Sequence, residues 1–160
     1  MPKKNLKSAI SALFGALLVV VLTGCGASGP DAPTRNIRQV TDGVEATSGS
    51  IKAVNVLLVA QEDGSAVLVG TFVNSGDTRD AITGITANGI VGDISISTLD
   101  QYSGPAIFEG SSKNSSAKFP GLNAKPSDHV ELEVTFATSA PMKMSAIVRA
   151  KAEEFANVGN

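Results

Sequence analysis

The chain has 160 residues, of which 42% are hydrophobic and 4% aromatic, and this composition is typical of one modest globular domain with additional segments. Its formal charge is -2. Every acidic residue lies after position 24, and three lysines lie before position 8. Residues 25–160 therefore carry 10 basic and 15 acidic side chains, which is a formal charge of -5. An acidic surface without a cluster of lysine and arginine repels phosphate backbones, which argues against nucleic acid as a partner.

The chain opens with a basic start, an apolar run and small residues, in that order. Three lysines stand among the first seven residues, and the apolar stretch from Ile10 to Leu22 is short for a membrane-spanning helix. This order is typical of a secretory signal peptide, and the alternative is an uncleaved anchor helix. We therefore predict that residues 1–24 are a signal peptide.

A single cysteine follows the apolar run directly. Leu22, Thr23 and Gly24 precede Cys25, and this segment resembles the lipobox that bacterial lipoprotein-processing enzymes recognise. We expect cleavage before Cys25 and covalent attachment of diacylglycerol and an acyl chain to it, with no other cofactor. Lipidation consumes the only thiol, so the mature domain has no disulfide. Two acyl chains anchor a protein firmly, at about 0.8 kcal/mol per buried CH2, which predicts a location on the extracytoplasmic face of the cell membrane.

Residues 25–49 are rich in glycine, proline, serine and charge, without a sustained apolar period. This composition predicts a flexible tether between the lipid and the folded domain. Ile37, Val40 and Val44 fall at near-helical spacing, but three apolar residues in a polar stretch support at most a short helical turn.

Residues 50–150 are predicted to form an antiparallel β-sandwich. Runs of β-branched residues alternate with turn residues at short intervals, which is typical of an all-β sandwich or barrel. The turn at Glu62–Ser65 predicts a hairpin between the first two runs. The candidate strands are Ile51 to Ala60, Ala66 to Asn74, Asp80 to Ala87, Ile94 to Leu99, Ala106 to Glu109, His129 to Ala137 and Met142 to Ala150.

The last two candidate strands have the clearest alternation. Apolar and polar residues alternate from His129 to Ala137 and again from Met142 to Ala150, which predicts an antiparallel pair with one buried face and one solvated face. Residues 110–117 are predicted to be a polar loop. Residues 151–160 are polar and are predicted to be a disordered tail.

Three features together resemble one family. The lipobox and tether, the segments Phe72–Asn74 and Asp80–Ile85, and the closing hairpin resemble the small actinobacterial lipoproteins of the LpqE type, which are related to the periplasmic copper chaperones called PCuAC. The resemblance covers Ile51 to Arg149. It implies a cupredoxin-like or immunoglobulin-like β-sandwich.

The resemblance does not extend to the copper ligands. PCuAC proteins gather two histidines and two methionines around Cu(I), since thioether and imidazole suit a soft ion. The segment Ser116–Pro120 holds no soft ligand here, and after processing the chain keeps only His129, Met142 and Met144. Alternation places His129 on the solvated face and Met144 on the buried face. Core methionines and a surface histidine are therefore expected, and an unrelated copper site built from these three residues is the alternative.

The residue inventory argues against an enzyme. The chain has one histidine, no free cysteine and no Gly-x-Ser-x-Gly segment, so the usual nucleophile and base pairs cannot be built. Ser115 and Lys118 match Ser-x-x-Lys formally, but in a serine-rich loop the match is a coincidence. The sequence therefore predicts a non-enzymatic, membrane-anchored module that binds another envelope protein through its loops or a strand edge. Copper binding or delivery is the first alternative, and lipid or glycan binding is the second.

Overall fold

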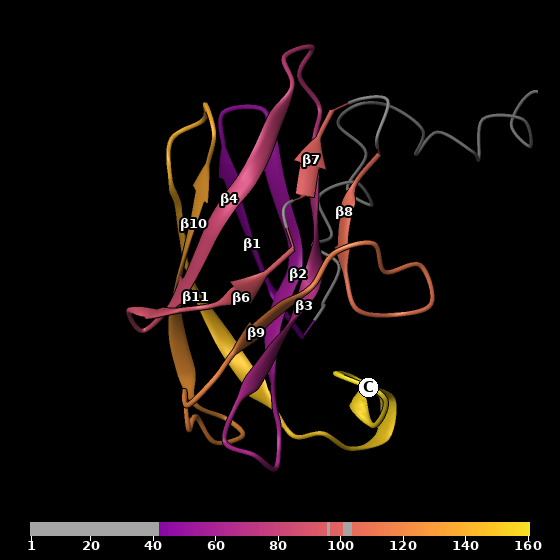
Figure 1. Ribbon diagram of the computed structural model, residues 1–160, viewed down its shortest axis with the longest axis vertical. Coiled ribbons are helices and arrows are strands. Elements are labelled where there is room, and N and C mark those ends of the chain that lie inside the picture. The colour runs from indigo at the N-terminus through magenta and orange to yellow at the C-terminus, as the bar shows by residue number, and fades with distance from the viewer. Residues whose placement is uncertain (1–41, 96, 101–103) are drawn as a thin grey trace, which may run out of the picture. The chain divides into compact units, whose positions relative to one another are not determined.

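The computed structural model describes residues 42–95, 97–100 and 104–160, so the predicted signal peptide, the lipidation site at Cys25 and most of the predicted tether lie outside it. The described residues form strands and one short 3-10 helix (Figure 1). None of the helices there is long and apolar enough to cross a membrane. The elements are β1 Val44–Ser48, β2 Ile51–Ala60, β3 Ala66–Asn74, β4 Asp80–Ala87, β5 Ile90–Val91, β6 Asp93–Ile94, β7 Ser97–Leu99, β8 Ala106–Phe108, β9 Ala117–Phe119, β10 His129–Phe136, β11 Met142–Arg149 and the 3-10 helix η3 Glu153–Phe155.

Two layers of strands are joined through β11. One layer holds β4, β10 and β11, with β5 and β7 paired to β4, and the other holds β2 and β3, with β1, β8, β9 and β6 around them. β11 is antiparallel to β10, but its last residues pair in parallel with β2, where Val148 and Arg149 lie opposite Leu58 and Val59. The predicted all-β sandwich is confirmed, with one parallel pairing closing it.

Both predicted hairpins are present. β2 and β3 pair from Ile51 opposite Asn74 to Ala60 opposite Ala66, and β10 and β11 pair in the predicted antiparallel sense. In the first hairpin the turn closes where the Gln61 amide donates to the Ser65 carbonyl at 2.8 Å. Alternation on β10 and β11 therefore assigned both strands and their buried faces correctly.

The core lies between the two layers. It is built from buried aliphatic residues of β2, β3, β4, β10 and β11 together with four phenylalanines, Phe72, Phe108, Phe119 and Phe136. Phe72 and Phe108 meet edge to face, with ring centroids 5.6 Å apart, a favoured geometry for aromatic pairs. Because no disulfide contributes, this apolar layer is the main source of the domain's stability.

A bulge in β2 exchanges the two faces of that strand. Pairing with β3 shifts between Val54 and Leu57, and Asn55 adopts a left-handed backbone conformation with φ 53°, which asparagine tolerates better than most residues. Its side-chain oxygen accepts a hydrogen bond from the Gly43 amide at 2.9 Å. Beyond the bulge Leu58 points into the core, so Leu57 and Val59 point outward.

The C-terminal segment corrects the prediction of a disordered tail. Residues 151–160, called the strap below, turn through η3 and place Val158 against the outward residues Leu57 and Val59 of β2. Both of those residues are 0% exposed. The strap therefore covers apolar side chains that the bulge turned outward.

The N-terminal boundary and two strands also differ from the prediction. The tether was expected to reach residue 49, but β1 pairs with β2 over Val44 to Ser48, so the folded domain begins earlier. The single strand expected over Ile94 to Leu99 is divided between β6, which pairs with β9, and β7, which pairs with β4. The predicted loop at 110–117 ends in β9, because Ala117 already pairs with Ile94.

Candidate binding surface on the outer sheet face

The three predicted soft ligands do not meet. Met142 and Met144 are 3% and 7% exposed in the core, opposite Val134 and Leu132 of β10. His129 is exposed at the start of β10, on the other face of the sheet. In the part of the chain that the structure describes, no group of three or more histidine, cysteine or acidic side chains is placed to hold a metal.

The Ser-x-x-Lys segment has structural contacts. The Ser115 hydroxyl donates to the Asn114 side-chain oxygen at 2.9 Å, and the Lys118 ammonium reaches the Asp63 carboxylate at 3.0 Å. A nucleophile and its base must lie within hydrogen-bonding reach of each other. These two side chains have different partners instead.

Asp80 of β4, a buried acid, binds the backbone of the turn between β10 and β11. Asp80 is 4% exposed, and its carboxylate accepts backbone hydrogen bonds from Ala81, Thr138 and Ser139 at 2.8–3.0 Å. Burial by itself raises the pKa of this carboxyl, but the hydrogen bonds from Ser139, Ala81 and Thr138 outweigh burial and hold the pKa well below its ordinary value. Asp80 therefore fastens this turn to β4, which is a structural role.

The outer surface of the second layer carries an ordered apolar array, which we call the outer face. This array has six residues, which lie in two rows across β11, β2 and β3, and five of the six are apolar. The sixth is an arginine at one corner. The outer face consists of Ile147 and Arg149 of β11, Leu57 and Val59 of β2, and Val67 and Val69 of β3.

The strap covers the outer face chiefly through two apolar side chains. Phe155 and Val158 pack on it. The strap's own backbone hydrogen bonds are local, for example from the Val158 amide to the Phe155 carbonyl at 3.1 Å. Its contact with the body of the domain includes a long hydrogen bond, 3.4 Å, from the Gly159 amide to the Glu109 carboxylate. Apolar contact thus holds the strap in place more than hydrogen bonding does.

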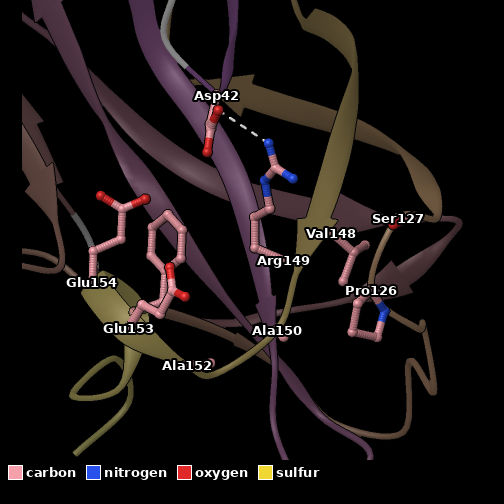
Figure 2. Close-up of a pocket in the computed structure, with 10 residues that line it drawn as sticks. Asp42, Pro126, Ser127, Val148, Arg149, Ala150, Ala152, Glu153 and Glu154 are labelled. Carbon is pink, nitrogen blue, oxygen red and sulfur yellow. Dashed lines mark ion pairs between the residues drawn. The ribbon is translucent and has the colours of Figure 1, made fainter.

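Arg149 has incomplete hydrogen bonding. Its Nη2 pairs with the Asp42 carboxylate at 3.0 Å, while its Nε is buried and, within the described part of the chain, has no hydrogen-bond partner. Figure 2 shows Arg149 between the strap residues Glu153 and Glu154 on one side and Pro126 on the other. These residues line a hollow with a volume of about 340 Å³. A buried donor without a partner is uncommon in native proteins.

Two more hollows lie along the strap. Their volumes are about 500 and 310 Å³, and Glu109, Lys113 and Asn160 line both. The Glu109 side chain is 7% exposed and pairs with Lys113 at 3.3 Å. The strap thus borders all three of these concave regions, and the outer face borders two of them, the first through Arg149 and the smallest through Val67.

Comparison with known proteins finds similarity at the level of the fold. No family model matches the sequence, and no curated protein matches it. A copper-bound PCuAC domain from PmoF2 aligns with a TM-score of 0.57 and 20% identity over 67% of this chain and 98% of that domain. The chain has the fold of a PCuAC domain. The apo PCuAC domains of PmoF1 and PmoF2 align with the same TM-score, at 16% and 17% identity, over 67% and 69% of this chain and 99% and 98% of theirs.

The PCuAC fold confirms the cupredoxin-like sandwich expected from the sequence. Identity of 16–20% shows the fold alone. Sequence reasoning missed the outer face and the strap. The only signals were the uninterrupted apolar run at residues 56–60 in the second half of β2 and the spacing of Phe155 and Val158 three residues apart.

Proposed function

We propose that this chain is a membrane-anchored lipoprotein of the cell envelope, of the LpqE type, whose PCuAC-fold domain is a non-enzymatic binding module for another envelope protein. The observation that supports this most is the outer face, an apolar array with an arginine at its corner that takes no part in the core between the sheets. Interfaces combine an apolar centre with anchoring residues such as arginine.

Anchoring rests on the lipobox segment Leu22–Gly24 before Cys25. A Cys25→Ser variant is expected to leave the membrane fraction and to keep the longer precursor, which fractionation and intact-mass measurement detect. Unchanged membrane association of that variant would contradict the anchor.

Crosslinking in cells tests the binding role. A tagged copy of the lipoprotein is crosslinked in living cells and recovered under denaturing conditions, with the untagged strain as the background. The proposal expects one dominant protein partner in the crosslinked product. Recovery of nothing above the background would count against it.

Copper handling is the second candidate function. It is supported by the likeness of the fold to a copper-bound PCuAC domain. The placement of the soft ligands favours it less, because Met142 and Met144 pack in the core while His129 lies on the opposite face. Titration of the folded protein with Cu(I) under reducing conditions should give no tight one-to-one complex. A tight complex that is lost in a Met144→Leu variant would make copper the primary ligand.

A further inference from the structure

We propose that the outer face binds an acidic, amphipathic helical segment of the partner protein, and that the strap occupies this site until the partner displaces it. The inference rests on the proposed function, because it names the surface and the chemistry of the segment that the module recognises.

The strap indicates what the outer face accepts. Phe155 and Val158, three positions apart, turn toward the same apolar residues, and Glu153 and Glu154 come directly before them. Residues three apart lie on one side of a helical segment. A partner segment with an aromatic residue, a branched aliphatic residue three positions later and acids at its start can fill the same site, as amphipathic helices do in apolar grooves.

Arg149 supplies a reason why a partner can compete with the strap. With the strap in place, Nε of this arginine is buried and has no hydrogen-bond partner among the described residues, while Nη2 pairs with Asp42. Glu153 and Glu154 line the same hollow, so displacement of the strap also removes two negative charges from the neighbourhood of the arginine. A carboxylate that reaches Nε beside Nη2 uses the fork of the guanidinium and satisfies the unpaired donor.

The strap can leave without loss of the site. The face beneath it belongs to β2, β3 and β11, whose ladders hold the side chains in register. The strap has local backbone hydrogen bonds and a 3-10 helix of three residues. Segments of this kind open locally at a lower free energy than central strands. Opening therefore exposes a binding site that is already formed.

The probe for the experiment is a synthetic peptide with the strap sequence, residues 151–160. It is added to the full chain, and the NMR signals of the Leu57, Val59 and Val67 methyl groups are followed. A double variant, Phe155→Ser with Val158→Ser, releases the strap and removes the competing occupant. We expect saturable shifts confined to the outer face, with an apparent affinity at least tenfold higher than in the wild type, since an occupied site lowers apparent affinity by its open fraction.

Two control peptides separate the contributions. Replacement of both glutamates by glutamine should weaken binding several-fold, and replacement of the phenylalanine and valine by serine should abolish the shifts. Unchanged signals of core methyl groups, such as those of Leu132, establish that the double variant is folded. Absence of peptide shifts in the folded variant overturns the proposal. If the double variant does not fold, Val158→Ala replaces it and the same result overturns the proposal.

Failure of this inference and failure of the proposed function are distinguishable. Arg149→Gln is compared in the cellular crosslinking experiment with a matched control, Arg79→Gln, whose arginine is exposed and pairs with Asp100. Capture of the same partner in equal yield by both variants keeps the binding role and overturns the site. Loss of the partner in Arg149→Gln alone, together with peptide binding, supports both.

Discussion

Two apolar layers of this domain, the core between the sheets and the outer face under the strap, contain residues with no exposed surface. Phe72 and Leu57 are both 0% exposed, yet strands close the core on both sides, whereas a strap of ten residues covers the outer face. Burial alone therefore does not separate residues that hold the fold from residues that serve binding. The two groups differ in what covers them, which is a strand layer on each side of the core and a short C-terminal segment on the outer face.

The largest expected effect is a cavity in the core. Phe72→Ala removes a ring that meets Phe108 edge to face and should lower the free energy of unfolding by about 3–5 kcal/mol. Urea denaturation followed by circular dichroism measures the loss. The matched pair is Val134→Ala in the core and Val59→Ala in the outer layer, since both valines are 0% exposed and lose the same two methyl groups. Val59→Ala should cost clearly less than Val134→Ala, because the strap can settle onto the smaller side chain. Equal losses of stability in the two valine variants would contradict the distinction between the layers.

The next effect concerns the backbone hydrogen bonds that the Asp80 carboxylate accepts at the edge of the core. Asp80→Asn should lower the free energy of unfolding by about 1–3 kcal/mol at pH 7, because the amide cannot accept all three backbone hydrogen bonds. The pKa of Asp80 lies below its ordinary value, so its stabilisation is present above that value and is lost as the pH falls.

The pH dependence of this variant provides the check. Urea midpoints of the wild type and Asp80→Asn should converge as the pH falls below about 4, the ordinary pKa of an aspartate. A difference that grows toward acid pH would mean that Asp80 is protonated in the native state.

A smaller effect is expected at the strap. Val158→Ala should cost about 1 kcal/mol, because it removes two methyl groups from the contact with Leu57 and Val59. Binding of an apolar fluorescent dye should rise at the same time, since the outer face becomes accessible. A loss of stability as large as that of Phe72→Ala would place the strap within the cooperative core.

The smallest effect is expected at an exposed ion pair. Lys143 and Glu133 lie 3.4 Å apart on the solvated face of the β10–β11 hairpin, with both side chains well exposed. Lys143→Ala should change the free energy of unfolding by less than about 0.5 kcal/mol, as measured by urea denaturation. A larger loss would show that the solvated face also contributes to the fold.

The sequence predicts the core layer far better than the outer layer. β10 and β11 alternate cleanly, so their buried faces and their pairing follow from side-chain period alone. In β2 the run at residues 56–60 is apolar throughout, and the bulge at Asn55 becomes evident only from the pairing of β2 with β3. Alternation cannot show that Leu57 points outward in such a run.

The strap and the division of residues 94–99 between β6 and β7 were not predicted, for related reasons. Phe155 and Val158 are two isolated apolar residues in a polar segment, and what they cover depends on a distant strand. The run from Ile94 to Leu99 passes from one layer to the other, which a local pattern does not reveal. At the site, placement of His129 apart from Met144 followed from alternation, whereas lipidation of Cys25 lies outside the described residues and stays a prediction.

Native-state hydrogen exchange on the full chain tests most directly whether the outer face is a preformed site under a displaceable cover. We expect the amides of the strap, such as that of Val158, to exchange through local opening at a free energy well below that of global unfolding, while the amides of β2 and β3 stay protected. Exchange of the strap only through global unfolding, together with β2 and β3, would contradict this expectation.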